Sequence, residues 1–270
     1  METQITQEVL IHKADVSTGG VKAQTDFVAK ETPLHIFLNR THYITILCSP
    51  SQLKELVVGH LLSEGLLKSI DKIQDISIDK NMVCRVKLDS SVNAEALIGL
   101  SKPFARLVTS ACGSPPSMTI PKLIDRIGLR KVPMDFRVEA KAVMNCVRQL
   151  NKFASVFRKT GGVHVAALFN IKGDLIALAE DVGRHNAVDK VIGSGTLRSA
   201  NFNKCFLALS GRLTGDIILK AARVGIPLVA SLAAAIDSGI EIADHTDITV
   251  IGFVRGNRMN VYANPNRVKI

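Results

Sequence analysis

The alternation of short apolar runs with helical patterns after residue 160 constrains the fold more than any other feature of the sequence. Residues 205–209, Cys-Phe-Leu-Ala-Leu, form a continuous apolar run that is typical of a strand buried on both faces. Strands that alternate with helices predict βαβ crossovers and a mainly parallel sheet covered on both sides. The expected strands are residues 163–169, 174–179, 205–209, 227–230 and 248–254, and the expected helices are residues 186–198, 216–224 and 236–243.

Residues 21–103 are expected to form a separate, small α+β domain. Ser49 and Pro50 suit the N-cap and the first position of its helix. The polar residues 1–20 end in Thr-Gly-Gly, and we predict that they are a flexible tail. Within the small domain, the expected strands are residues 34–38, 43–47, 73–78 and 82–88, and the expected helix is residues 53–64.

Residues 104–135 are expected to connect the small domain to an α/β domain of residues 136–270. The connector contains Thr-Ser-Ala-Cys-Gly-Ser-Pro-Pro-Ser at 109–117, and these small residues and prolines fit neither a helix interior nor a central strand. We therefore predict an exposed loop around Cys112. The α/β domain is expected to begin with one long amphipathic helix from about Val143 to Phe157, which places Cys146 in the core.

Composition narrows the class of protein. A chain of 270 residues that is 47% hydrophobic buries a large core, which excludes global disorder. The net charge of +10 suits an anionic partner, but only 12 residues are aromatic and no run of Lys and Arg occurs, which argues against a nucleic-acid partner. No apolar run is long enough to cross a membrane and the first residues do not resemble a signal peptide, so we expect a cytoplasmic protein without a membrane partner.

The five cysteines form an odd set without Cys-x-x-Cys spacing, which fits neither a disulfide framework nor a four-ligand zinc site. We therefore expect no metal site, and any special cysteine acts alone. Cys112 is the candidate, because it lies among small residues and because Lys102 and Arg106 favour a thiolate; the alternative is an ordinary loop cysteine. The remaining cysteines are expected to pack in the core: Cys48, Cys84, Cys146 and Cys205.

A polar segment follows the strand expected at residues 174–179, where open α/β sheets bind ligands and where helix N-termini hold anions. Arg184 offers a planar fork for a phosphate or a guanine edge. Asp181, His185 and Asn186 could contact polar groups of the same ligand. The alternative, which the spacing does not separate from the first, is a local helix cap with a surface salt bridge.

Other strand ends carry similar residues and should lie on the same edge of the sheet. Two glycines before His164 permit close approach of a ligand to the backbone. Several such turns would line one crevice that suits a polyanion such as a nucleotide diphosphate, or they would be unused charged loops. The candidate binding residues are Gly161, Gly162, His164, Asp181, Arg184, His185, Asn186, Ser210, Gly211, Arg212, Phe253, Val254, Arg255, Gly256, Asn257 and Arg258.

Taken together, these motifs resemble the FdhD family, accessory sulfurtransferases of formate dehydrogenases. The most specific match is residues 180–190, Glu-Asp-Val-Gly-Arg-His-Asn-Ala-Val-Asp-Lys. The other matching segments are residues 31–34, 38–39, 59–65, 160–164, 210–212, 225–227 and 252–256, together with Lys220.

The resemblance implies a protein that accepts sulfur from a cysteine desulfurase as a persulfide. It implies delivery of this sulfur to the molybdenum bis(molybdopterin guanine dinucleotide) cofactor before that cofactor enters the formate dehydrogenase apoenzyme. It also implies a homodimer and a second domain similar to the three-layer cytidine deaminase fold. Residues 253–258 match the family's guanine-dinucleotide segment, and Arg184 and His185 would lie near the same ligand.

The sulfur-carrying loop departs from the family pattern. The family reads Cys-Gly-x-Cys-Gly, whereas this chain reads Cys112-Gly113-Ser114-Pro115-Pro116, so the first cysteine matches and Pro115 replaces the second. A rival function is therefore a cofactor chaperone that binds the guanine dinucleotide without sulfur chemistry. A zinc hydrolase on a deaminase-like fold is excluded, because its H-x-E and P-C-x-x-C ligand motifs do not occur in the sequence.

Overall fold

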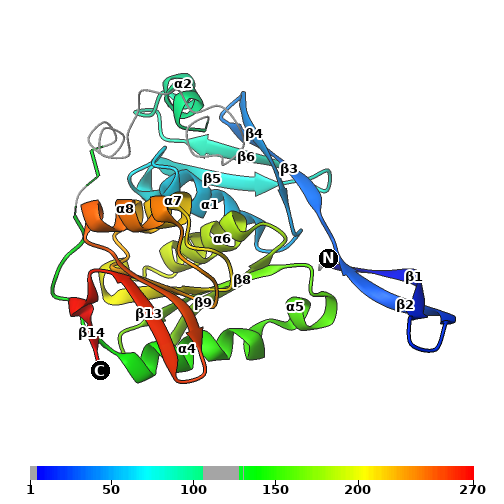
Figure 1. Ribbon diagram of the computed structural model, residues 1–270. Coiled ribbons are helices and arrows are strands. Elements are labelled where there is room, and N and C mark those ends of the chain that lie inside the picture. Colours follow the sequence, from blue (N-terminus) through cyan, green and yellow to red (C-terminus); the bar gives the residue numbers. More distant parts are fainter. Residues whose placement is uncertain (1–4, 106–127, 130) are drawn as a thin grey trace.

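The computed structural model describes residues 5–105, 128–129 and 131–270, which form a mixed α/β protein with several sheets (Figure 1). A body built on a six-stranded sheet carries a smaller four-stranded sheet with its own helices, and a β-hairpin projects to one side. Cys112 and most of the predicted connector lie outside the described residues.

The large sheet is mixed and not mainly parallel. Its strand order is β13-β12-β11-β10-β8-β9, and only the β10–β11 and β11–β12 pairs are parallel. Tight turns at Gly173 (φ 87°) and Gly256 (φ 54°) reverse the chain and give the antiparallel pairs β8–β9 and β12–β13, and β13 is a strand that the sequence analysis did not predict. The strands are β8 (His164–Asn170), β9 (Leu175–Asp181), β10 (Cys205–Leu209), β11 (Leu228–Ser231), β12 (Thr249–Arg255) and β13 (Arg258–Ala263).

Helices cover both faces of this sheet. On one face lie α6 (Arg184–Leu197), α7 (Gly215–Val224) and α8 (Asp237–Thr246), and on the other lie α4 (Ala140–Phe153) and α5 (Ser155–Thr160) (Figure 1). Alternate residues of β10 enter the two cores, Leu207 on the α6 side and Phe206 on the α4 side, which confirms a strand buried on both faces. The specific likeness to cytidine deaminases stays a prediction.

The helix expected around residues 143–157 is interrupted at Ala154. The Glu180 carboxylate accepts the backbone N–H groups of Val156 (3.1 Å) and Phe157 (2.7 Å), and it thereby starts the new helix α5. Near the C-terminus, β14 (Val268–Lys269) pairs in parallel with β7 (Val138–Glu139), the short strand that directly precedes α4.

The smaller sheet has the order β4-β3-β6-β5, and α1 (Leu53–Ser63) packs against its buried face. This helix does not begin at Ser49-Pro50, since Gln52 has a left-handed conformation (φ 49°) and the helix starts after it. Ser49 instead bonds to the body of the protein, as described below. The strands are β3 (Thr32–Leu38), β4 (Thr41–Cys48), β5 (Ile73–Ile78) and β6 (Val83–Leu88), followed by α2 (Ala94–Ala105).

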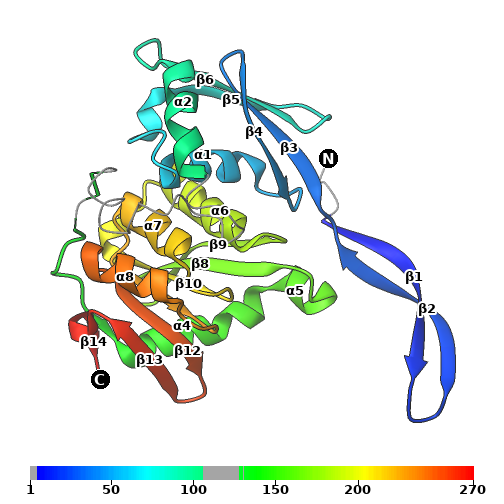
Figure 2. The ribbon, with the colours of Figure 1, turned by 45° about the horizontal axis from the view of Figure 1, so that its top comes forward.

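Residues 6–15, which we expected to be part of a flexible tail, form a strand. Strand β1 (Thr6–Asp15) pairs along its whole length with β2 (Gly20–Ala29) in antiparallel register. The resulting ribbon extends away from both sheets (Figures 1 and 2).

Two glycines allow α1 of the small sheet layer to pack closely against α6 of the body. At Gly59 of α1 a Cβ atom would lie 1.7 Å from the carbonyl oxygen of Asp189, and at Gly193 of α6 it would lie 1.9 Å from that of Glu55. The two helices therefore cross backbone to backbone, which only glycine permits.

Candidate functional site

The predicted binding residues gather at one edge of the large sheet. His164 begins β8 and lies opposite Asp181 at the end of β9, because these two strands are antiparallel. Ser210 follows β10, whose last residue lies beside Ala166 of β8. Since β11 and β12 run parallel to β10, the end of β12 lies at the same edge. The topology therefore brings together turns that are far apart in the sequence.

His164 and Arg184 lie side by side around Gly211. A Cβ atom at Gly211 would be 3.2 Å from Cβ of Arg184 and 3.6 Å from Nδ1 of His164, so the glycine allows these side chains to approach. The Ser210 hydroxyl accepts the Val165 N–H (3.0 Å) and lies 3.5 Å from His164 Nδ1. Gly211 therefore shapes the edge by its lack of a side chain.

This edge is electropositive, and some of its side-chain nitrogen atoms have no hydrogen-bond partner among the described residues. Burial, followed by the charge of Arg212, lowers the pKa of Arg184; burial, followed by Arg184 and His185, lowers the pKa of His164. Within the described part of the chain, Arg184 Nε and His185 Nε2 are buried without a hydrogen-bond partner, and His185 Nε2 stands 3.5 Å from Oδ2 of Asp216. A bound anion would relieve the repulsion and satisfy the donors.

Two helices begin at this edge. Arg184 is the first residue of α6 and Gly215 the first of α7, and neither N-cap residue, Gly183 or Thr214, caps its helix with a side chain. The Thr214 hydroxyl has no hydrogen-bond partner among the described residues. The Gly215 N–H of α7 donates to the Ser238 hydroxyl (3.3 Å). The partial positive charge of the two helix N-termini favours a phosphate here.

The β12–β13 turn carries an exposed ring and guanidinium groups. Phe253 is 38% exposed, and its ring centroid lies 5.6 Å from the guanidinium carbon of Arg255, an arrangement that suits stacking on a planar base. The Arg148 guanidinium donates to the Gly256 carbonyl and to Oδ1 of Asn257 (2.8 Å), which fixes the turn.

Neighbours of the turn differ in accessibility. Arg258 is exposed, whereas Val254 is only 1% exposed and packs in the core beneath α4. A ligand at the turn can therefore meet the side chain of Arg258 but only the backbone of Val254.

The structure places Asp181 and Asn186 in the joint between the two layers, not in the crevice. Asp181 is fully buried; its carboxylate pairs with Lys190 (2.6 Å) and accepts from the N–H of Ser49 (3.0 Å) and from the Asn186 amide (2.9 Å). The same Asn186 amide donates to the Leu47 carbonyl (2.8 Å). The bonds of these two residues are structural, but the ion pair is buried and not on the surface as the helix-cap alternative expected.

The two predicted glycines before His164 also have structural roles, at the end of a helix and at a close contact with the hairpin. Gly161 (φ 65°) ends α5, and a Cβ at Gly162 would lie 3.1 Å from Cβ of Ala29 in β2. Gly162 therefore permits the base of the hairpin to approach the body.

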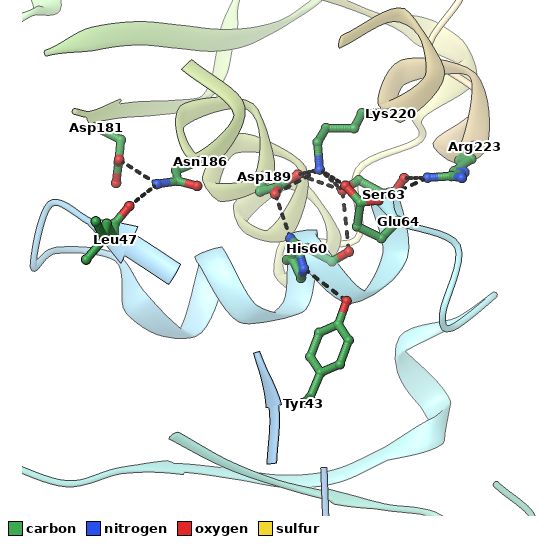
Figure 3. Close-up of polar contacts among 10 residues, drawn as sticks. All are labelled: Tyr43, Leu47, His60, Ser63, Glu64, Asp181, Asn186, Asp189, Lys220 and Arg223. Atoms are coloured by element: carbon green, nitrogen blue, oxygen red, sulfur yellow. Dashed lines mark hydrogen bonds and ion pairs between the residues drawn. The ribbon is translucent and has the colours of Figure 1, made fainter. Parts of the chain in front are cut away.

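A buried polar cluster that the sequence analysis did not assign links α1, α6 and α7 (Figure 3). Asp189 bonds to His60 Nδ1 (3.1 Å), to the Ser63 hydroxyl (2.6 Å) and to Lys220 (2.8 Å). Lys220 also pairs with Glu64. Figure 3 shows these side chains converging from the three helices, with Tyr43 and Arg223 at the two ends.

The charges in this cluster support each other. Burial raises the pKa of Asp189 and of Glu64, but Lys220 and His60 outweigh it and hold both at about 2. The same carboxylates raise the pKa of Lys220 against its burial. The sequence signal was present, because His60 and Glu64 fall on the apolar stripe of their helix and Lys220 lies inside an apolar one.

The cysteines in the described ranges are all buried. Burial is the first cause that raises the pKa of each thiol, to about 12 for Cys48 and Cys84 and to about 11 for Cys146 and Cys205. These values do not suit a nucleophilic thiolate. The expectation that these four cysteines pack in the core is confirmed, and Cys112 falls outside the described residues.

The described residues contain no group of three or more His, Cys, Asp and Glu placed to hold a metal ion. In the same part of the chain, no helix has the length and apolar character that a membrane crossing requires.

Comparisons with known proteins all point to the same family. The model of the FdhD/NarQ family matches residues 29–269. A protein of Sulfolobus acidocaldarius named sulfur carrier protein FdhD is 35% identical, over 94% of this chain and 96% of its own length. Its namesake in Methanothermobacter thermautotrophicus is 40% identical, over 82% of each chain.

A solved structure supports the same assignment. The crystal structure of a protein from Desulfotalea psychrophila, assigned as a formate dehydrogenase accessory protein, matches with a TM-score of 0.79 and 27% identity. The match covers 98% of this chain and 100% of that chain. By sequence and by fold, this chain belongs to the FdhD/NarQ family.

Proposed function

We propose that this protein is a sulfurtransferase that carries sulfur as a persulfide on Cys112 and serves a formate dehydrogenase. The names of its relatives support a sulfur carrier, and the Desulfotalea structure supports the link to formate dehydrogenase. The observation that carries the choice of residue is the burial of the four described cysteines, whose raised pKa values make them poor nucleophiles. A cysteine desulfurase is the proposed donor, and the cytoplasm is the proposed location.

Loading requires one exchange. The Cys112 thiolate attacks the outer sulfur of the donor persulfide, the donor's S–S bond breaks, and the donor cysteine leaves as a thiolate. Cys112 then bears the persulfide, and no external oxidant is consumed. A lowered thiol pKa favours this step, which is consistent with the neighbouring Lys102 and Arg106 in the sequence.

Release of the outer sulfur as sulfide needs an electron pair. A second cysteine in the loop could supply the pair by closing a disulfide, but Pro115 stands at that position. The pair therefore comes from the molybdenum centre that accepts the sulfur, whose formal oxidation state rises by two. The other source is an external thiolate, which attacks the inner sulfur of the persulfide, breaks its S–S bond and expels the outer sulfur as sulfide. A second thiol then reduces the mixed disulfide and restores the Cys112 thiolate.

The proposed acceptor is molybdenum bis(molybdopterin guanine dinucleotide), bound as a substrate at the electropositive sheet edge. The buried Arg184 Nε, which has no hydrogen-bond partner among the described residues, the neighbouring His185 and the positive ends of α6 and α7 suit its phosphates. The exposed ring of Phe253 beside Arg255 suits a guanine base.

Mass spectrometry tests the carrier role. The protein is incubated with a cysteine desulfurase and cysteine, and its intact mass and cysteine peptides are analysed. We expect the gain of one sulfur atom on the Cys112 peptide, absent in Cys112→Ser and retained in the matched control Cys205→Ser. Transfer of sulfur to the cofactor by the Cys112→Ser protein would refute the proposal.

The mass measurement, together with a GDP-binding assay, distinguishes the rival function from the proposed one. The lack of a second loop cysteine favours a chaperone that binds the guanine dinucleotide without sulfur transfer. In that case no sulfur is gained, while GDP still binds and Arg184→Gln weakens its binding. Arg85→Gln, which removes an exposed arginine of β6 paired with Asp79, is the control for charge alone.

A further inference from the structure

Strand β12 carries a bulge at Phe253. In its pairing with β13, residues 253 and 254 together lie opposite one residue, Met259. Phe253 itself has a left-handed backbone (φ 50°), a conformation that bulky side chains rarely adopt. Such a conformation persists only where the surrounding structure holds it, and residues held in this way cluster at functional sites.

The bulge decides which way the side chains of β12 point. In a regular strand, residues three apart face opposite sides of the sheet. Ile251 and Val254 nevertheless share the core beneath α4, because the bulge shifts the alternation between them. The Phe253 ring is left 38% exposed at the sheet edge. The strained residue therefore presents an aromatic ring to the outside and does not fill the core.

The loop after β11 holds one side of the bulge. The Phe253 N–H donates to the Ala233 carbonyl (3.0 Å), and Arg255 Nε donates to the Leu232 carbonyl (3.1 Å). A Cβ atom at Gly252 would lie 3.0 Å from the Ala233 carbonyl oxygen, so the glycine makes room for this contact. These bonds fix the bulged strand against the loop.

Arg148 of α4 holds the turn that follows the bulge. Helix α4 packs against β12, and the guanidinium of Arg148 donates to the Gly256 carbonyl and to Oδ1 of Asn257 (2.8 Å) (Figure 2). One exposed side chain thus ties two successive residues of the turn to the helix. A Cβ atom at Gly256 would meet nothing within 4 Å, so the bonds from Arg148 restrain a turn that is open around this residue.

We infer that Arg148 is a positioning residue for the Phe253 ring, on which a guanine base stacks. By fixing the turn, Arg148 limits the movement of the bulged segment, so the ring is in place before a ligand arrives. A preformed platform lowers the ordering that binding requires. The inference rests on the proposed guanine-dinucleotide site and adds a residue that sets its affinity for the base without contacting the ligand.

Two ligands separate the base from the phosphates. The affinities of the full chain for GDP and for inorganic pyrophosphate are measured by titration calorimetry. Arg148→Gln should weaken GDP binding by about threefold to tenfold and leave pyrophosphate binding within about twofold, because only GDP carries a base to stack. Lys152→Gln removes an exposed cation of the same helix and should leave both affinities unchanged.

Any other pattern in Arg148→Gln, such as an equal loss of both ligands, overturns the inference. A wild type that binds pyrophosphate but not GDP would instead refute the proposed cofactor site. The two failures are therefore distinguishable.

A double-mutant cycle links Arg148 to the ring. Phe253→Leu should weaken GDP binding by about tenfold, since the apolar leucine offers no flat face to the base. In the Phe253→Leu background, Arg148→Gln should add little, because no ring remains to be positioned. Additive losses would mean that Arg148 acts independently of Phe253, and they would reject the inference.

A single tryptophan tests the positioning without a ligand. The chain contains no tryptophan, so Phe253→Trp introduces one fluorophore at the bulge. We expect the fluorescence anisotropy of the Phe253→Trp protein to fall when Arg148→Gln is added, because the bulged segment then moves more freely, and to stay the same when Lys152→Gln is added. Equal anisotropy with and without Arg148→Gln refutes the positioning role, whether or not GDP binds.

Discussion

Substitution of Gly59 by alanine should open the crossing of α1 and α6. The new Cβ would lie 1.7 Å from the Asp189 carbonyl oxygen, and real Cβ atoms essentially never approach closer than 3.0 Å. The helices must therefore separate by at least about 1.3 Å. Both atoms belong to backbone, so no side chain can rotate away.

The expected loss of stability follows from two opposing effects. Overpacking between rigid backbones costs about 3–4 kcal/mol, at or above the upper end of the usual range. Alanine in a helix gains about 1 kcal/mol over glycine. The free energy of unfolding should therefore fall by about 2–3 kcal/mol.

Urea unfolding of matched variants measures this loss. Gly193→Ala should cost a similar amount, because its Cβ would lie 1.9 Å from the Glu55 carbonyl oxygen. The double variant should cost less than the sum, since both changes open the same crossing. Gly99→Ala in α2, where nothing lies within 4 Å of the new Cβ, is the control and should be neutral or stabilising. A Gly59→Ala protein as stable as the control would refute the close crossing.

Three further predictions concern titratable groups. Lys220→Met should destabilise the protein by about 3–5 kcal/mol at pH 7, because Asp189 is left buried and unpaired. Since the pKa of Asp189 is about 2 when folded and about 3.9 when unfolded, its wild-type contribution is present above about pH 4 and is lost towards pH 2. The deficit in urea midpoint should therefore shrink between pH 4 and pH 2. The lowered pKa of His164 predicts a neutral imidazole at pH 7 and a stability that falls below about pH 6.5; bound GDP should raise this pKa in an NMR titration, and an unchanged value argues against a nearby phosphate. In Cys112→Ser the four buried thiols should react with a thiol reagent only on unfolding, and rapid native labelling would contradict their burial.

Local patterns predicted much of the fold because periodicity and turn residues act over a few positions. The apolar run at residues 205–209 correctly indicated a doubly buried strand, and the stripe around Cys146 correctly indicated a core-facing helix. Strand direction could not be predicted in this way. The antiparallel placement of β8 and β13 depends on which strands become neighbours, which is a property of the whole sheet.

Polar residues show the same division. The sequence alone identified Arg184, Arg212 and His164 as residues at strand ends, and the topology brought them to one edge. It could not separate a ligand contact from a structural bond at Asp181, because the partner Ser49 lies 132 residues away in the sequence and because only the packing of α6 on β9 brings Lys190 to this carboxylate.

The sequence by itself determined the family and the alternation of strands and helices from β8 to β12, and it set Cys112 apart from the other cysteines. Only the tertiary structure decided that the first strand of the chain pairs into a projecting hairpin and that Gly59 and Gly193 meet. It also decided that His60, Asp189 and Lys220 share one buried cluster. The physical reason is that burial, pairing and close approach are relations between residues far apart in the chain, and local propensity does not encode them.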